Sequence, residues 1–188
     1  TAQDHKRQLD GDKGPNTGGM GAYSPSPLLA EDMLNLVSET IIAPTIAGMA
    51  AEGNPYKGFL YVGLMITSTG PKVVEYNCRF GDPECQVVIP RLRSDLLTHL
   101  VQSTRGELLG EDIVFDQQYR TTVVLVSGGY PVSYDKGFPI FGLDEFEKVE
   151  AVQVFHAGTK DQDGQLCTAG GRVLNVVGTG STLQGSIS

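Results

Sequence analysis

The sequence predicts an α+β fold. Two stretches carry apolar residues at helical spacing, residues 31–51 and 94–105. Five short apolar or β-branched runs predict strands, and Gly, Pro and polar residues separate most of them. These runs cover residues 59–67, 72–77, 121–127, 152–156 and 171–177. A chain of 188 residues can form one large domain or two small ones.

The composition changes over residues 106–118, after which strand-forming runs predominate. We therefore expect a first domain over residues 1–110 and a β-rich second domain over 111–188. The second domain is expected to be incomplete, because the chain ends in GTGSTLQGSIS without a closing element.

Residues 1–25 are polar and Gly-rich and show no helical or strand period. Asp4–Arg7 concentrates ionisable groups, and Asn16–Gly21, NTGGMG, concentrates flexible backbone. A loop of this kind can fold over a phosphate through its N–H groups. We expect such a loop here, and a Gly-rich tail without fixed structure is the alternative.

The helical pattern of residues 31–51 is interrupted by Pro44, which predicts two helical segments or one kinked helix. A strand over 59–67 and a strand over 72–77 are joined by the turn STGP, which predicts an antiparallel hairpin.

The last predicted helix follows Ser94, which is a plausible N-cap. Its inward face is expected to consist of apolar side chains. These are Leu96, Leu97, Leu100 and Val101.

The net charge is −8 and no Lys/Arg run is present, so we expect no nucleic-acid partner. The three cysteines form no CxxC pair, which favours a reducing, cytoplasmic location over a disulfide framework or zinc site. No uninterrupted apolar stretch of about 18 residues is evident, so we expect no transmembrane helix and no membrane partner.

Glu75 and Asn77 are two residues apart at the end of a predicted strand, so their side chains share one face. A carboxylate and an amide oxygen are hard ligands of the kind that suit Mg²⁺. An ordinary solvated strand face is the alternative.

Arg79 would lie on the same face if the strand continued, and Asp82 follows shortly after it. A permanently charged guanidinium beside a metal can stabilise a phosphoryl group or an acyl phosphate. A local salt bridge in a turn is the alternative reading of Arg79 and Asp82.

Two long segments resemble signatures of the phosphoribosylamine–glycine ligase family, also called glycinamide ribonucleotide synthetases. They are EYNCRFGDPECQVVIPRL and DHKRQLDGDKGPNTGGMGAYSP. The strand YVGLMIT and the later pieces SGGYP, HAGT and GGRVL also fit, so the resemblance covers nearly the whole chain.

The resemblance implies the later part of an ATP-grasp core followed by a small β-rich C-terminal domain. It implies an enzyme of de novo purine synthesis that uses ATP and Mg²⁺, with Mn²⁺ as a possible substitute, to activate glycine as glycyl phosphate. The amine of 5-phosphoribosylamine then attacks, giving glycinamide ribonucleotide, ADP and phosphate.

The resemblance also assigns roles to residues of this chain. Glu75 and Asn77 would be metal ligands, and Lys6 would contact the nucleotide. Arg79 and Asp82 would bind glycyl phosphate and substrate. The loop closing over phosphoribosylamine would contain Asn16, Thr17, Gly18, Gly19 and Met20.

The family's N-terminal domain and its lid domain, which holds adenine, have no counterpart in these residues. We therefore expect a fragment that is inactive alone and needs the rest of the same enzyme as its partner. The alternatives are another ATP-grasp ligase and a non-catalytic remnant that binds a nucleotide or a partner protein.

Overall fold

The computed structural model describes residues 1–146 and 148–188, which form two compact units. The sheet unit comprises Thr1–Pro25, Asp82–Arg91 and Gln117–Ser188. The hairpin unit comprises Ser26–Gly81 and Leu92–Asp116. Both units are assembled from segments that are distant in sequence. The predicted division into domains 1–110 and 111–188 stays a prediction.

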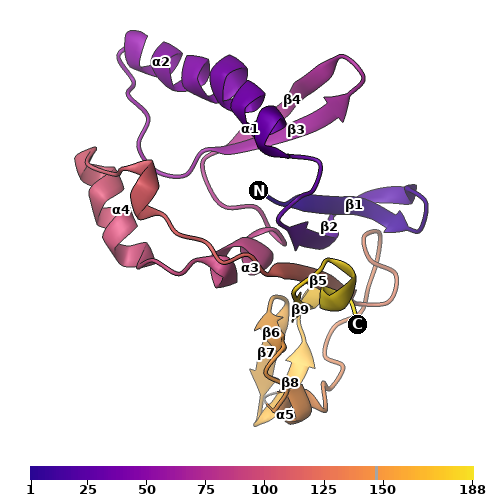
Figure 1. The fold of residues 1–188 in the computed structure, drawn as a ribbon. Helices are drawn as coiled ribbons and strands as arrows, with labels where there is room; N and C mark the ends of the chain where they lie inside the picture. The colour runs from indigo at the N-terminus through magenta and orange to yellow at the C-terminus, as the bar shows by residue number, and fades with distance from the viewer. Residues whose placement is uncertain (147) are drawn as a thin grey trace. The chain divides into compact units, whose positions relative to one another are not determined.

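The sheet unit is built on a five-stranded sheet in the spatial order β1-β2-β5-β9-β6, in which every pair of neighbours is antiparallel (Figure 1). The runs predicted at 121–127, 152–156 and 171–177 are confirmed as strands. The five strands are β1 (Gln3–Leu9), β2 (Lys13–Ser24), β5 (Tyr119–Val126), β6 (Val152–His156) and β9 (Arg172–Gly180).

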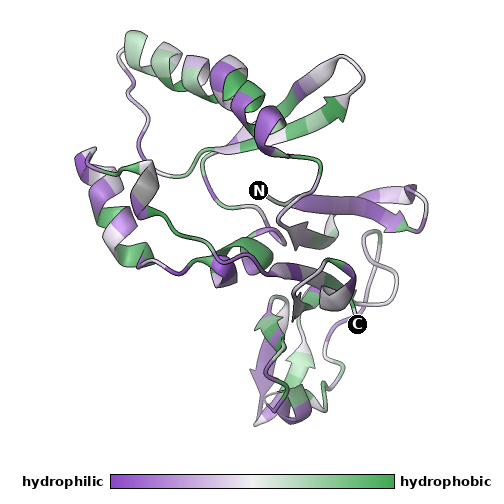
Figure 2. Ribbon diagram, viewed as in Figure 1, coloured by the Kyte–Doolittle hydropathy of each residue, from purple (hydrophilic) through white to green (hydrophobic). Residues whose placement is uncertain are grey.

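The expectation that residues 1–25 form a loop is wrong, because most of them belong to β1 and β2. Residues Gly21–Ser24 pair with Arg120–Val123 of β5. Hydrogen bonds to a strand so distant in sequence cannot be predicted from the local pattern of residues. Figure 2 shows β1 as largely hydrophilic, so alternation of apolar and polar residues could not reveal it.

A small apolar core of the sheet unit consists of Ala22, Val87 and Val177, and Ala2, Val88 and Phe155 pack against it. Val87 comes from the short helix α3 (Cys85–Val88), which continues into a 3₁₀ turn at Ile89–Arg91. The remaining elements are α5 (Leu143–Phe146), the hairpin of β7 (Thr159–Gln162) and β8 (Gln165–Thr168), and a 3₁₀ turn at Gln184–Ser186.

The hairpin unit contains the predicted antiparallel pair, β3 (Tyr61–Thr67) and β4 (Gly70–Asn77). Its helical segment consists of α1 (Glu31–Val37), a π-helical turn at Ser38–Ile42, and α2 (Ala43–Ala51). Pro44 stands in the first turn of α2, where its missing N–H is tolerated. The π-helical turn immediately before α2 is therefore the interruption that the sequence predicts.

One helix, Glu31–Ala51, is long and apolar enough to cross a membrane by length and composition alone. This criterion is weak evidence, so the expectation of no transmembrane helix stays a prediction. That expectation rested on the lack of an uninterrupted apolar run, whereas this helix has a high mean hydropathy although acidic residues lie near its start. Core helices of soluble proteins meet the same criterion, so it does not by itself place the chain in a membrane.

Helix α4 (Leu96–Arg105) corrects two expectations. Its N-cap is Asp95, whose carboxylate accepts a hydrogen bond from the Thr98 N–H at 2.6 Å. Ser94 instead bonds His99 Nε2 at 2.7 Å and accepts from the Val114 N–H. His99 is thus the buried residue of this helix. The side chains of Leu97, Leu100 and Val101, predicted to face inward, are exposed.

Candidate active site

Glu75 and Asn77 lie at the end of β4, and their side chains share one face of the hairpin. Tyr76 between them points the other way, because its hydroxyl hydrogen-bonds Thr45 of α2 at 3.0 Å. Side chains alternate along a strand, so Glu75 and Asn77 face away from α2. Their role as metal ligands stays a prediction.

The donor atoms of this pair fit a magnesium ion. Carboxylate and amide oxygens are hard ligands, and Mg²⁺ keeps waters or phosphate oxygens in its other positions. Among residues 1–146 and 148–188, no three His, Cys, Asp or Glu side chains gather as a metal-binding group. Glu75 and Asn77 would thus supply two of the oxygen ligands of such an ion.

Gly63 of β3 lies directly opposite Glu75, next to an irregularity in the strand pairing. A Cβ placed on Gly63 would lie 3.0 Å from Glu75 Cγ and 3.3 Å from the Tyr61 ring. The absence of a side chain at Gly63 therefore leaves the space that the Glu75 side chain uses.

Arg79 does not continue the strand face, because β4 ends at Asn77. Its guanidinium Nη1 donates to its neighbour's carbonyl, Phe80 O, at 2.9 Å. The ring of Phe80 packs against that of Phe59, with centroids 3.9 Å apart. Arg79 thus stands in a bend fixed by an aromatic pair, and its binding role stays a prediction.

The residues Asn16 to Met20 contain a wide bulge of β2, which begins directly after the paired Asn16. Between the pairs His5–Gly21 and Arg7–Asn16, β1 has one residue, Lys6, and β2 has four, residues 17–20. Thr17 Oγ1 ties the bulge together, since it donates to Lys6 O at 2.9 Å and accepts from the Gly19 N–H at 3.0 Å.

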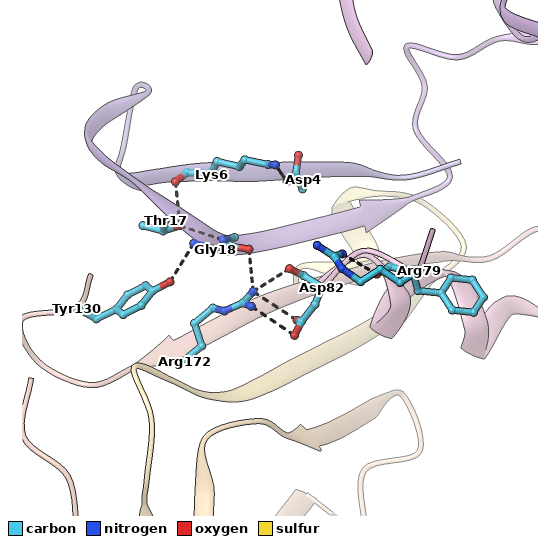
Figure 3. Close-up of polar contacts among 10 residues, drawn as sticks. Asp4, Lys6, Thr17, Gly18, Arg79, Asp82, Tyr130 and Arg172 are labelled. Carbon is cyan, nitrogen blue, oxygen red and sulfur yellow. Dashed lines mark hydrogen bonds and ion pairs between the residues drawn. The ribbon is translucent and has the colours of Figure 1, made fainter. Parts of the chain in front are cut away.

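Lys6 points its ammonium toward Asp4, with Nζ and Oδ2 3.6 Å apart, and its side chain is 46% exposed (Figure 3). It is placed on β1 directly beside the bulge. The structure thus brings Lys6 and the Gly-rich residues together, as two parts of one strand pair.

Asp82 is joined to the bulge by Arg172, at the start of β9 (Figure 3). Arg172 Nη1 donates to Gly18 O at 2.9 Å and to Asp82 O at 2.8 Å. Its Nη2 also lies 3.4 Å from Asp82 Oδ2. A second bond fixes the same carboxylate, because Gln86 Nε2 donates to Asp82 Oδ1 at 3.1 Å.

Two family models match the chain in sequence order. The ATP-grasp (A) domain of phosphoribosylglycinamide synthetase matches residues 1–85, and the C domain of the same synthetase matches residues 120–188. The chain belongs to the phosphoribosylglycinamide synthetase family.

Curated relatives of this synthetase family agree. The chain is 53% identical over 180 residues to a phosphoribosylamine–glycine ligase of Agrobacterium fabrum. The matched region covers 96% of this chain but only 42% of that protein. It is 52% identical over 177 residues to the trifunctional purine biosynthetic protein adenosine-3 of Gallus gallus, covering 93% of this chain and 17% of that protein. The chain thus spans less than half the length of these relatives.

Solved structures share the fold of this synthetase chain. A phosphoribosylamine–glycine ligase from Thermotoga maritima has a TM-score of 0.81 at 36% identity, covering 98% of this chain and 45% of that one. An N5-carboxyaminoimidazole ribonucleotide synthetase from the same organism has a TM-score of 0.57 at 17% identity, covering 90% and 43%. The predicted α+β, ATP-grasp-related fold is confirmed.

Sequence reasoning missed three residues of this family member that contact or face candidate residues within their own unit. Gly63 lies within YVGLMIT, Tyr130 within SGGYP, and Arg172 within GGRVL, all of which carried the family resemblance. None of the three was predicted to have a role. The space left by a glycine, and a hydrogen bond between residues distant in sequence, can be recognised only when the facing residue is known.

Proposed function

We propose that this chain is the later part of an ATP-dependent ligase that joins glycine to 5-phosphoribosylamine. A glycine carboxylate oxygen attacks the γ-phosphorus of ATP and ADP leaves. The amine of phosphoribosylamine attacks the resulting glycyl phosphate, and phosphate leaves with formation of glycinamide ribonucleotide. The observation that carries this proposal is the ordered match of both synthetase domains along one chain.

In this proposal Glu75 and Asn77 hold Mg²⁺, which when bound would neutralise charge on the phosphate oxygens of the nucleotide. Arg79 supplies a fixed positive charge for glycyl phosphate, and Lys6 contacts the nucleotide. Phosphoryl transfer requires mainly positioning and charge neutralisation, so none of these residues has to act as a nucleophile.

Asp82 binds the amine or hydroxyl groups of the substrates, and the bulge of residues 16–20 covers phosphoribosylamine. A Gly-rich bulge suits an anionic phosphate, because glycine has no side chain to keep the phosphate away from the backbone. The rest of the enzyme supplies the adenine pocket, and we place the whole protein in the cytoplasm with these small molecules as its partners.

The test is a coupled ADP-release assay on the full-length polypeptide with glycine and freshly made phosphoribosylamine. We expect Glu75→Ala to lower kcat/KM by roughly 10³-fold or more, because the metal contact holds the transferring group. Lys72→Ala, an exposed change on the same strand, is the matched control and should leave turnover unchanged. Full turnover by Glu75→Ala would refute the metal assignment.

A further inference from the structure

The peptide groups on both sides of Gly18 are held by two side chains from distant parts of the sheet unit (Figure 3). The Gly18 N–H donates to the hydroxyl of Tyr130 at 2.9 Å. The Gly18 carbonyl accepts from Arg172 Nη1 at 2.9 Å. These two bonds fix the orientation of the backbone at the centre of the bulge.

The guanidinium of Arg172 binds the bulge and Asp82 at once. Besides Gly18 O, it donates to the Asp82 carbonyl and lies 3.4 Å from both oxygens of the Asp82 carboxylate. The Arg172 side chain is 23% exposed, so most of it is withdrawn from solvent. A planar guanidinium can serve several acceptors in one geometry, whereas a lysine ammonium cannot.

The fit between Gly18 and Arg172 is close. A Cβ on Gly18 would lie 3.0 Å from Arg172 Cζ, so the guanidinium rests directly against the glycine. The next residue, Gly19, has a φ of +122°, and a Cβ there would overlap Pro83, the residue after Asp82. The bulge therefore meets Arg172 at Gly18 and the Asp82–Pro83 segment at Gly19.

We propose that Arg172 and Tyr130 are positioning residues, which hold the bulge of residues 16–20 against Asp82 before substrate binds. The inference rests on the proposed function, because it takes the bulge and Asp82 as the substrate-binding surface. Preorganisation of this kind acts on substrate affinity and alignment, since displacement of a binding group by about 1 Å can cost about 10²-fold in rate.

The test uses the full-length enzyme with Tyr130→Phe, which deletes one hydroxyl, and Arg172→Met, which deletes the guanidinium. We expect Tyr130→Phe to raise the KM for phosphoribosylamine about 5- to 20-fold with little change in kcat. Arg172→Met should lower kcat/KM by about 10²-fold, and Arg172→Lys should recover only a minor part of that loss.

Matched controls separate this effect from general destabilisation. Tyr134→Phe alters a neighbouring ring, whose centroid lies 6.0 Å from that of Tyr130. Arg93→Met breaks a different ion pair, with Asp116 at 2.6 Å, in the hairpin unit. Both controls should leave the KM for phosphoribosylamine unchanged.

Amide hydrogen exchange supplies a readout that does not need turnover. We expect exchange at the Gly18 and Gly19 amides to accelerate in Tyr130→Phe and Arg172→Met, with melting temperature nearly unchanged. The double variant Arg172→Met with Asp82→Asn should be little worse in kcat/KM than the poorer single variant.

Unchanged exchange at residues 16–20, or fully additive effects of Arg172 and Asp82, would overturn the positioning role. A lower melting temperature with unchanged KM would also overturn it, since the tie would then serve only the fold. A wild-type enzyme that does not ligate glycine would refute the proposed function alone, because the exchange result stands independently of it.

Discussion

Arg172 and Asp82 lie 90 residues apart in sequence, yet the Arg172 guanidinium donates to the Asp82 carbonyl at 2.8 Å and approaches its carboxylate at 3.4 Å. The contact joins two segments that sequence analysis treated separately, FGDPE and GGRVL. It makes Asp82 part of a fixed surface rather than a mobile turn.

Removal of the Asp82 charge should affect activity far more than stability. The Asp82 side chain is 50% exposed, so its ion pair contributes about 1 kcal/mol or less to the free energy of unfolding. We expect Asp82→Asn to lower kcat/KM by about 10²-fold or more, because substrate loses a charged contact. Asp116→Asn, which breaks the pair with Arg93, should leave kcat/KM unchanged. Equal effects of both variants on turnover would contradict this account.

Gly63→Ala should raise the concentration of Mg²⁺ that turnover requires. The new methyl group would stand 3.0 Å from Glu75 Cγ, so the carboxylate must shift by a few tenths of an ångström. We expect about 5- to 20-fold more Mg²⁺ to be needed for half-maximal turnover.

Gly48→Ala is the matched control for Gly63→Ala, because Gly48 lies in α2 with open space around it. It should leave the Mg²⁺ dependence unchanged and raise the free energy of unfolding by roughly 0.5–1 kcal/mol. An unchanged Mg²⁺ requirement in Gly63→Ala would show that the glycine does not position Glu75.

The Cys85 thiol should react slowly with maleimides at neutral pH. Burial raises the pKa of this thiol, and the carboxylates of Asp82 and Glu84 raise it further. Less thiolate is therefore present at a given pH, and the thiolate is the reactive form. Mass spectrometry of labelled full-length protein should show the exposed Cys78 modified well before Cys85.

The same labelling rate should respond to a neighbouring charge. Asp82→Asn removes one of the carboxylates that raise the pKa of Cys85, so its labelling rate at pH 8 should increase. A Cys85 that labels as fast as Cys78 in the unaltered protein at pH 7 would contradict the assignment.

The hydrogen bond that caps α4 should make the free energy of unfolding vary with pH in the acid range. The hydrogen bond from the Thr98 N–H lowers the pKa of Asp95 below its usual value. Because the pKa of Asp95 is lower in the folded state, its ionised carboxylate stabilises the fold at pH values above the unfolded pKa of about 3.9. This stabilisation is lost as the pH falls through the pKa of the folded state. Asp95→Ala should therefore lower the melting temperature at pH 7, and the difference should disappear in acid. A Ser94→Ala variant that reproduces this pH dependence would contradict Asp95 as the cap.

Local patterns predicted the elements whose hydrogen bonds are local. The hairpin of β3 and β4 and the interrupted helix over residues 31–51 follow from residue type and spacing, and the structure confirms both. The alternation that placed Glu75 and Asn77 on one face needs only the geometry of a single strand.

The contacts that the sequence patterns did not predict involve residues that are distant from one another in sequence or side chains that bind a polar residue. Strand β2 pairs with the neighbouring β1, but its last residues, Gly21–Ser24, pair with the distant β5. Arg172 reaches Gly18 across 154 positions of sequence. The inward face of α4 was predicted from its leucines, but Ser94 and Gln102 bind His99 and turn that residue inward.

The measurement that tests the central claim most directly follows oxygen from glycine to phosphate. Full-length enzyme turns over ATP, phosphoribosylamine and glycine labelled with ¹⁸O in its carboxylate, and mass spectrometry analyses the released phosphate. Ligation through glycyl phosphate predicts one ¹⁸O atom in each phosphate formed, in step with ADP. Phosphate free of label, released at the rate of amide formation, would contradict the proposed function.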